Sequence, residues 1–232
     1  MTAPAPAIAL TGISKRFGPV QANRDVSLSV ASGSIHGIVG ENGAGKSTLM
    51  SILYGFYEAD AGEIAVGGRP CVIRTPADAI ALGIGMVHQH FMLVETLSVV
   101  ENVVLGAEGG ATLARGVDSA RAALKKLEED YELEVDPDAV VEELPVGLQQ
   151  RVEILKALYR GADILILDEP TAVLSPPEVE QLFRILERLR QQGRTVLLIT
   201  HKLKEIMAIT DRVSVLRRGQ VVAEFITADT NR

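Results

Sequence analysis

The chain has 232 residues, of which 47% are hydrophobic and 23% charged, and its formal net charge is −7 at pH 7. This length and composition suit a globular protein with ample core, and no apolar run reaches the ~18 residues that a membrane-spanning helix needs. The negative charge counts against duplex nucleic acid as a ligand, because phosphate backbones are bound by clustered Lys and Arg. The single cysteine, Cys71, excludes an internal disulfide, and the first residues lack the basic and apolar leader of a signal peptide, so we expect a cytoplasmic protein.

The first third of the chain has patterns typical of short strands. Alternating or continuous apolar residues predict strands over 7–13, 25–30, 35–39 and 84–87. Residues 14–19 would connect the first two strands. Turn residues between short β-like runs predict a small antiparallel unit over 60–75, and a short helix is expected over 78–82.

From about residue 90 to residue 158 the pattern changes to that of helices. Apolar residues at helical spacing predict helices over 97–105, over 118–131 and from about residue 147. In the second of these, one face would be formed by Ala120, Ala123, Leu124, Leu127 and Tyr131, while the charged residues opposite them would face solvent.

Strands return after residue 158. Continuous apolar runs over 164–167 and 195–199 are typical of parallel strands that are covered on both faces. Between them, Ser175 and Glu178 form a capping box that opens a helix, and Gly193 ends it. A helix over 201–208 and strands over 213–216 and 221–225 are expected to follow.

Strands that alternate with helices predict an α/β protein with a mainly parallel sheet. We expect a single domain over 1–232, with a core formed by about 1–89 and 159–232, a small antiparallel β subdomain, and a helical insertion over about 90–158.

A glycine-rich segment between the predicted strand 35–39 and the following helix fits the phosphate-binding loop pattern G-x-x-x-x-G-K-[ST] at every fixed position. Its glycines let backbone N–H groups turn toward an anion, and the helix N-terminus adds partial positive charge. Lys46 would reach the β- and γ-phosphates of a nucleotide, and the Ser47 hydroxyl would coordinate Mg²⁺. A glycine turn that merely precedes a helix is the alternative, and the complete match disfavours it. The predicted nucleotide contacts in this loop are Gly40, Asn42, Gly43, Ala44, Gly45, Lys46, Ser47 and Thr48.

Two carboxylates, Asp168 and Glu169, end the predicted strand 164–167. Open α/β sheets bind ligands at the carboxyl ends of their strands, so both side chains are expected beside the phosphate loop. Asp168 would hold Mg²⁺, directly or through water, and Glu169 would orient and deprotonate the attacking water.

Two further polar residues follow buried strands. His201 comes after the strand 195–199 and could hydrogen-bond the γ-phosphate, although a histidine at a strand end is equally often a simple cap. Gln89 comes after the strand 84–87 and could contact Mg²⁺ or the water.

Four ordered motifs resemble those of ABC transporter ATPases over essentially the whole chain: GENGAGKST, LPVGLQQR at 144–151, ILILDEPTAVLS at 164–175, and His201. The resemblance implies the ABC ATPase fold, ATP and Mg²⁺ as ligands, and ATP hydrolysis. It also implies that Gln89 and His201 sense the nucleotide and that Phe17 stacks on adenine, with ordinary packing as the alternative for Phe17. The implied signature residues, which contact the nucleotide held by an opposite subunit, are Leu144, Pro145, Val146, Gly147, Leu148 and Gln149.

Within that superfamily, GIGMVHQHFML at 83–93 and the stretch 144–175 resemble the ATPases of nucleoside importers, which are relatives of ribose-type sugar importers. This resemblance implies transmembrane permease subunits as partners, an extracellular substrate-binding protein acting indirectly, no nucleic acid, and a place on the inner face of the cell membrane. Such proteins usually carry two ABC domains, so a second ABC domain is expected, in the same full-length chain. A simple-sugar importer ATPase, a soluble ABC ATPase acting on ribosomes or DNA, and a module that binds ATP without hydrolysis are the alternatives.

Two positions depart from the common motifs of the family. The usual signature serine is Pro145, which has neither a hydroxyl nor an N–H. The aspartate usual in the loop after Glu169 is Ser175, which a helix cap would explain.

Overall fold

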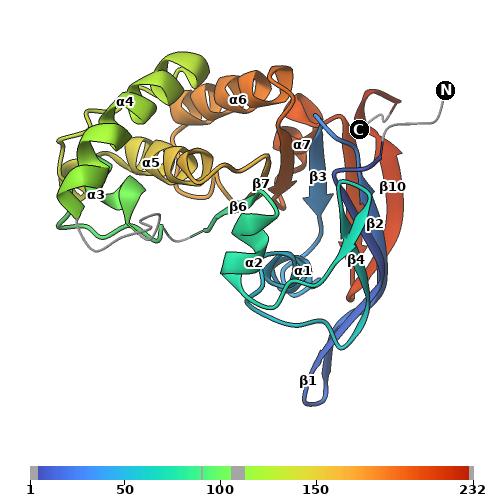
Figure 1. The fold of residues 1–232 in the computed structure, drawn as a ribbon. Coiled ribbons are helices and arrows are strands. Elements are labelled where there is room, and N and C mark those ends of the chain that lie inside the picture. Colours follow the sequence, from blue (N-terminus) through green and yellow to red (C-terminus); the bar gives the residue numbers. More distant parts are fainter. Residues whose placement is uncertain (1–4, 90, 106–112, 230–232) are drawn as a thin grey trace.

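The computed structural model describes residues 5–89, 91–105 and 113–229, with side chains of the long helix from residue 120 onward. Within these ranges the strands form two sheets (Figure 1). The smaller sheet is antiparallel, in the order β2-β1-β4-β5. Its strands are β1 (Ile8–Phe17), β2 (Val20–Val30), β4 (Ala61–Val66) and β5 (Arg69–Cys71).

The larger sheet has the order β10-β9-β3-β8-β7-β6. All neighbours in it are parallel except the pair β9 and β10. Asp168 pairs with Ile199, so the carboxyl ends of β7 and β8 lie side by side, with the end of β3 next to them. The strands are β3 (Ile35–Val39), β6 (Ile84–Val87), β7 (Ile164–Asp168), β8 (Thr195–Ile199), β9 (Arg212–Arg217) and β10 (Gln220–Ile226).

The parallel strands are apolar throughout because both faces of the sheet are covered. In β7, Leu165 and Leu167 join one buried cluster, and Ile164 and Ile166 join the other, as the two-residue period of a strand requires. The first cluster includes residues of α6 (Pro176–Gln191) and α7 (Leu203–Ile209), and the second includes α1 (Lys46–Leu53) and α2 (Pro76–Ala81).

The helical stretch lies to one side of the large sheet (Figure 1). It comprises α3 (Val99–Val104), α4 (Leu113–Tyr131) and α5 (Val146–Tyr159), which pack on one another, and α5 also contacts β6. On the predicted face of α4, Ala120, Leu124 and Tyr131 are buried, whereas Ala123 and Leu127 are only half-buried. Short 3₁₀ turns occupy Val141–Glu143 and Thr227–Asp229. In the part of the chain that the structure describes, none of the helices has the length and apolar character to cross a bilayer.

The first hairpin is longer than the sequence pattern predicts. β1 continues to Phe17 and β2 begins at Val20, so the connecting turn is only residues 18–19 and not 14–19. This arm is largely exposed, so its residues do not alternate between core and solvent and the strand pattern is lost. Gly12 and Asp25 have positive φ, of 65° and 51°, where the pairing register shifts.

The helices differ from the predicted ones mainly at their N-terminal ends. α7 begins at Leu203, because Lys202 is extended, with φ −88° and ψ 95°; His201 therefore lies in the preceding turn. α2 begins at Pro76, because Thr75 forms a capping box with Asp78.

Candidate functional site

The glycine-rich loop connects β3 to α1, as the sequence predicts. Two of its glycines have no space for a side chain. A Cβ on Gly40 would lie 2.2 Å from the carbonyl oxygen of Leu216, and one on Gly45, whose φ is +99°, would lie 2.3 Å from that of Ala22. The loop is therefore held against two neighbouring strands, with the first turn of α1 directly after it.

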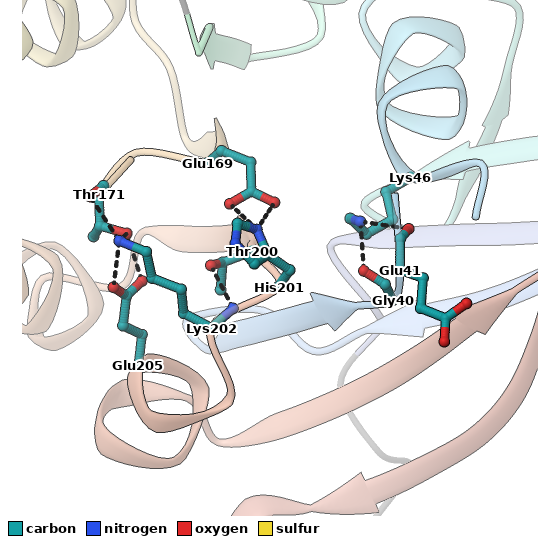
Figure 2. A network of polar contacts seen from close by, with 9 residues as sticks. All are labelled: Gly40, Glu41, Lys46, Glu169, Thr171, Thr200, His201, Lys202 and Glu205. Atoms are coloured by element: carbon teal, nitrogen blue, oxygen red, sulfur yellow. Dashed lines mark hydrogen bonds and ion pairs between the residues drawn. The ribbon is translucent and has the colours of Figure 1, made fainter. Parts of the chain in front are cut away.

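Lys46 is buried, and its side chain curls back over the loop (Figure 2). Its Nζ donates to the carbonyl oxygens of Gly40 at 2.6 Å and Glu41 at 3.1 Å. The ammonium is thus fixed beside the backbone amides that would surround an anion, and its present acceptors are neutral carbonyls that an anion can replace.

Asp168 is buried at the end of β7, and its Oδ1 has no hydrogen-bond partner among the described residues. Burial raises the pKa of this carboxyl; a hydrogen bond from Ser47 opposes that shift, the charge of Glu169 adds to it, and the charge of Lys46 opposes it. The structure therefore brings Asp168 to the phosphate loop, as predicted. A buried carboxylate oxygen without a partner, next to a serine hydroxyl, is a donor set that suits Mg²⁺.

Glu169 and His201 meet across the ends of β7 and β8 (Figure 2). The His201 Nδ1 lies 3.0 Å from each carboxylate oxygen of Glu169. Glu169 has a φ of +47°, which is uncommon for a residue with a side chain and is typically held by surrounding contacts at functional sites. The structure places the two predicted residues together, with His201 on the carboxylate.

Gln89 and Phe17 are both exposed. Gln89 lies two residues after β6, the strand next to β7. Phe17 is 40% exposed at the tip of β1, and its ring meets that of Tyr57 edge-on, at a centroid distance of 5.0 Å. Lys15 Nζ lies 5.5 Å from the centre of the Phe17 ring. The sequence does not single out Tyr57, because it is one of three aromatics in the stretch 54–57 after α1 and nothing in the pattern says which of them meets Phe17.

The six signature residues lie at the N-terminal end of α5. Pro145 is the N-cap of this helix and offers no side-chain cap. A Cβ on Gly147 would lie 2.6 Å from Oε1 of Glu178, in α6. The other oxygen of that carboxylate accepts from the Ser175 N–H at 2.8 Å and from its hydroxyl at 2.6 Å. Ser175 is therefore a helix cap, as predicted, and its capping partner also reaches Gly147.

A second polar cluster, which the sequence reasoning missed, lies next to Glu169 and His201. It consists of Thr171, Lys202 and Glu205, which contact one another (Figure 2). Its only sequence signal is that Thr171 and Lys202 follow the two predicted site residues closely.

Comparisons with known proteins agree with this geometry. The sequence profile of the ABC transporter family matches residues 23–172. The chain is 51% identical over 215 residues to a nucleoside import ATP-binding protein of Lactococcus lactis. This match covers 93% of this chain and 42% of that protein. It is 48% identical over 255 residues to a glucose import ATP-binding protein of Haloferax volcanii, covering 98% of this chain and 46% of that protein. The chain thus spans less than half the length of both curated relatives.

The fold is also that of ABC transporter ATP-binding cassettes. A nucleotide-free ATP-binding cassette from an ABC transporter superposes with a TM-score of 0.84 at 28% identity, covering 95% of this chain and 91% of that one. The family profile covers well over half of the chain, and the phosphate loop and the strand bearing Asp168 fall within it. The chain therefore belongs to the ABC transporter family, as one of its ATP-binding cassettes.

Proposed function

We propose that the chain binds ATP with Mg²⁺ and hydrolyses it to drive import through a membrane transporter. The observation that supports hydrolysis best is the set of groups at the carboxyl end of the large sheet. A lysine ammonium over the phosphate loop, a buried carboxylate with a free oxygen, and a glutamate held by a histidine all lie there. Phosphoryl transfer needs positioning and charge stabilisation of this kind more than covalent chemistry.

In this proposal the loop amides bind the phosphates, and Lys46 exchanges its two carbonyl acceptors for the β- and γ-phosphates. Ser47 and Asp168 would hold Mg²⁺, with Gln89 as a further ligand that reaches the ion or its water. The ion, when bound, neutralises charge on the phosphates. Phe17 would stack on the adenine, which typically contributes ~1–3 kcal/mol, with Tyr57 supporting its ring.

Glu169 would orient the attacking water and accept its proton. His201 would hydrogen-bond the γ-phosphate; its contact with Glu169 already puts it at the carboxylate that receives the proton. The signature residues 144–149 would face the nucleotide of an opposite ABC domain, which belongs to the same full-length protein.

The nucleoside-importer resemblance and the Lactococcus lactis relative support nucleosides as the transported substrate. Simple sugars are the second candidate, which the Haloferax volcanii relative supports. Either function places the chain on the inner face of the membrane against permease subunits, with a substrate-binding protein outside. The helical stretch of about 90–158 would be the subdomain that meets the permease, and 1–89 and 159–232 the catalytic core.

Lys46 and Glu169 are expected to fail differently, and this difference tests the hydrolysis proposal. Lys46→Ala removes a contact to ground-state phosphate, so it should weaken ATP binding itself. Glu169→Gln keeps the shape of the side chain but not the base, so ATP binding should persist while turnover falls by ~10²–10⁴-fold, and an ATP-bound dimer should accumulate. Undiminished turnover of the Glu169→Gln variant would remove Glu169 as the base.

Copurification tests the transport proposal. The full-length protein that contains this chain should copurify with membrane permease subunits from detergent-solubilised membranes. Recovery with ribosomes instead would favour an ABC ATPase that acts outside the membrane.

A further inference from the structure

The position of His201 needs an explanation, because its side chain is 55% exposed. The backbone on both sides of it is fixed instead. Thr200 is fully buried, and its N–H donates to the carbonyl oxygen of Ile38, in β3, at 3.3 Å. The Lys202 N–H donates to the Thr200 hydroxyl oxygen at 3.0 Å. The ring therefore projects from a turn whose placement depends on its two neighbours.

The side chain of Lys202 crosses to the loop that follows Glu169 (Figure 2). Its Nζ donates to the carbonyl oxygen of Thr171 at 2.8 Å and to the hydroxyl oxygen at 3.2 Å, and it pairs with Glu205 at 3.2 Å. The Thr171 hydroxyl in turn donates to Glu205 at 2.6 Å. Thr171 is fully buried and Glu205 is 9% exposed, while the Lys202 side chain is 38% exposed, so the three residues form a closed triangle in which Thr171 and Glu205 are shielded from solvent.

Two cross-links thus join the loops that follow β7 and β8. One is the contact between Glu169 and His201, and the other is the bond from Lys202 to Thr171. On the first loop only Pro170 separates the two linked residues, and its ring fixes φ. On the second loop they are adjacent, so a displacement of Lys202 displaces His201 with it.

We propose that Lys202, Thr171 and Glu205 form a positioning cluster that holds His201 against Glu169. The inference rests on the proposed function, in which Glu169 is the base. In this proposal the cluster does not act on the attacking water or the phosphate directly; it acts through the geometry of the two loops. If the Lys202 ammonium is removed, the Glu205 carboxylate loses its cation and the second loop loses its link to the first, so the exposed His201 ring is free to leave the carboxylate.

Nuclear magnetic resonance of the histidine rings tests this directly, because the chain has four histidines. In the wild-type background, Glu169→Gln changes the group that His201 contacts and should move the His201 ring nitrogen signals. In the Lys202→Met background, the same substitution should move them by less than half as much. An equal displacement in both backgrounds would overturn the proposal. Lys204→Met, at an exposed lysine in the first turn of α7, is the matched control and should leave the displacement at its wild-type size.

Thr171→Val keeps the side-chain shape and removes the hydroxyl that contacts Lys202 and Glu205, while the carbonyl acceptor of Lys202 remains, so it should act in the same direction as Lys202→Met with a smaller effect. The ring signals of His36, buried in β3, report whether each variant is folded. If Lys202→Met does not fold, Thr171→Val decides, and a full-sized displacement there refutes the cluster.

Steady-state kinetics separates this inference from the proposed function. Lys202→Met should lower kcat about ten- to a hundredfold with an unchanged KM for ATP, because the phosphate loop is untouched and only the catalytic geometry is loosened. Wild-type kcat in Lys202→Met would overturn the positioning role. A wild-type protein that hydrolyses no ATP at all would overturn the proposed function, while the resonance experiment, which needs no nucleotide, would still decide the inference.

Discussion

The burial of His36 predicts how the free energy of unfolding depends on pH. It lies in β3, just before the phosphate loop, and is 1% exposed. Its Nε2 lies 2.8 Å from the Ser214 hydroxyl, which donates onward to Glu224 at 3.1 Å, while Nδ1 is buried with no partner among the described residues. Burial, and secondarily the charge of Arg212, lowers the pKa of His36 from 6.5 to about 4.

The sign of the effect follows from which state binds more protons. Below pH 6.5 the unfolded chain protonates His36, while the folded chain does so only near pH 4, so stability is full above pH 6.5 and is lost as the pH falls. At 1.36 kcal/mol per pKa unit, the whole difference is worth about 3 kcal/mol, of which about 2 kcal/mol falls between pH 7.5 and pH 5. That is a large fraction of the stability of an ordinary domain.

Urea unfolding at pH 7.5 and pH 5 measures this loss. His36→Gln removes the titrating ring, so its free energy of unfolding should fall by about 2 kcal/mol less than that of the wild type over the same interval. Ser214→Ala is the matched control: it removes the hydrogen-bond partner but keeps the ring, so it should be less stable at both pH values and retain the wild-type pH dependence. The same loss in the wild type and His36→Gln would refute the reasoning.

Three further predictions concern the surface and the helix ends. Met92 is 57% exposed beside Gln89, so Met92→Asp should prevent copurification with the permease while leaving the melting temperature unchanged; surviving assembly would place the contact elsewhere. Ser175→Ala should lower the free energy of unfolding by about 1 kcal/mol, whereas Ser175→Asp, which can still cap, should not. Equal free energies of unfolding of the two variants in urea would contradict the capping role. The isolated chain should bind Mg-ATP, stay largely monomeric and hydrolyse slowly. Fast hydrolysis that rises cooperatively with protein concentration would contradict the idea that the site facing Pro145 is weak.

The sequence predicted the parts of the fold that depend on period or on a motif. β7 and β8 were found because a strand covered on both faces is apolar throughout, and the loop before Lys46 because its glycines are required by backbone contacts. Asp168 was placed beside the loop by topology alone. The arm from Lys15 to Asn23 was missed, because it is largely exposed and carries no alternating pattern.

The polar contacts around the site could not be predicted in the same way. Thr171 and Glu205 are 34 positions apart, and their contact depends on how two loops leave neighbouring strands. The sequence left His201 open between a phosphate contact and a simple cap; the structure adds its contact with Glu169, where Glu169 has a positive φ and α7 starts only at Leu203. Neither feature has a sequence pattern.

The two positions that depart from the common motifs of the family, Pro145 and Ser175, lie on either side of one contact, between Glu178 and Gly147. Pro145 provides no side-chain cap to α5, and the Glu178 carboxylate, held by the capping bonds from Ser175, accepts a hydrogen bond from the Gly147 backbone at that end instead. A phosphate brought to Gly147 by an opposite domain would find no hydroxyl, whose hydrogen bond to a charged group typically contributes ~1.5–3 kcal/mol, and it would also meet a carboxylate of like charge.

We expect this arrangement to weaken the proposed signature, while the proposed catalytic groups at the carboxyl end of the sheet are unaffected. None of the signature residues takes part in the contacts described above for Lys46, Asp168, Glu169 and His201. An intact phosphate loop with a weakened signature is useful only beside a different domain whose own signature is intact. In such a pair, the site built on this chain's loop would turn over ATP, and the site facing Pro145 would hold it, with a rate difference of roughly ten- to a hundredfold or more if the lost bond acts in the transition state. Two copies of this chain would have two weakened sites, so slow turnover by the chain alone follows from the same contact that makes the pair asymmetric.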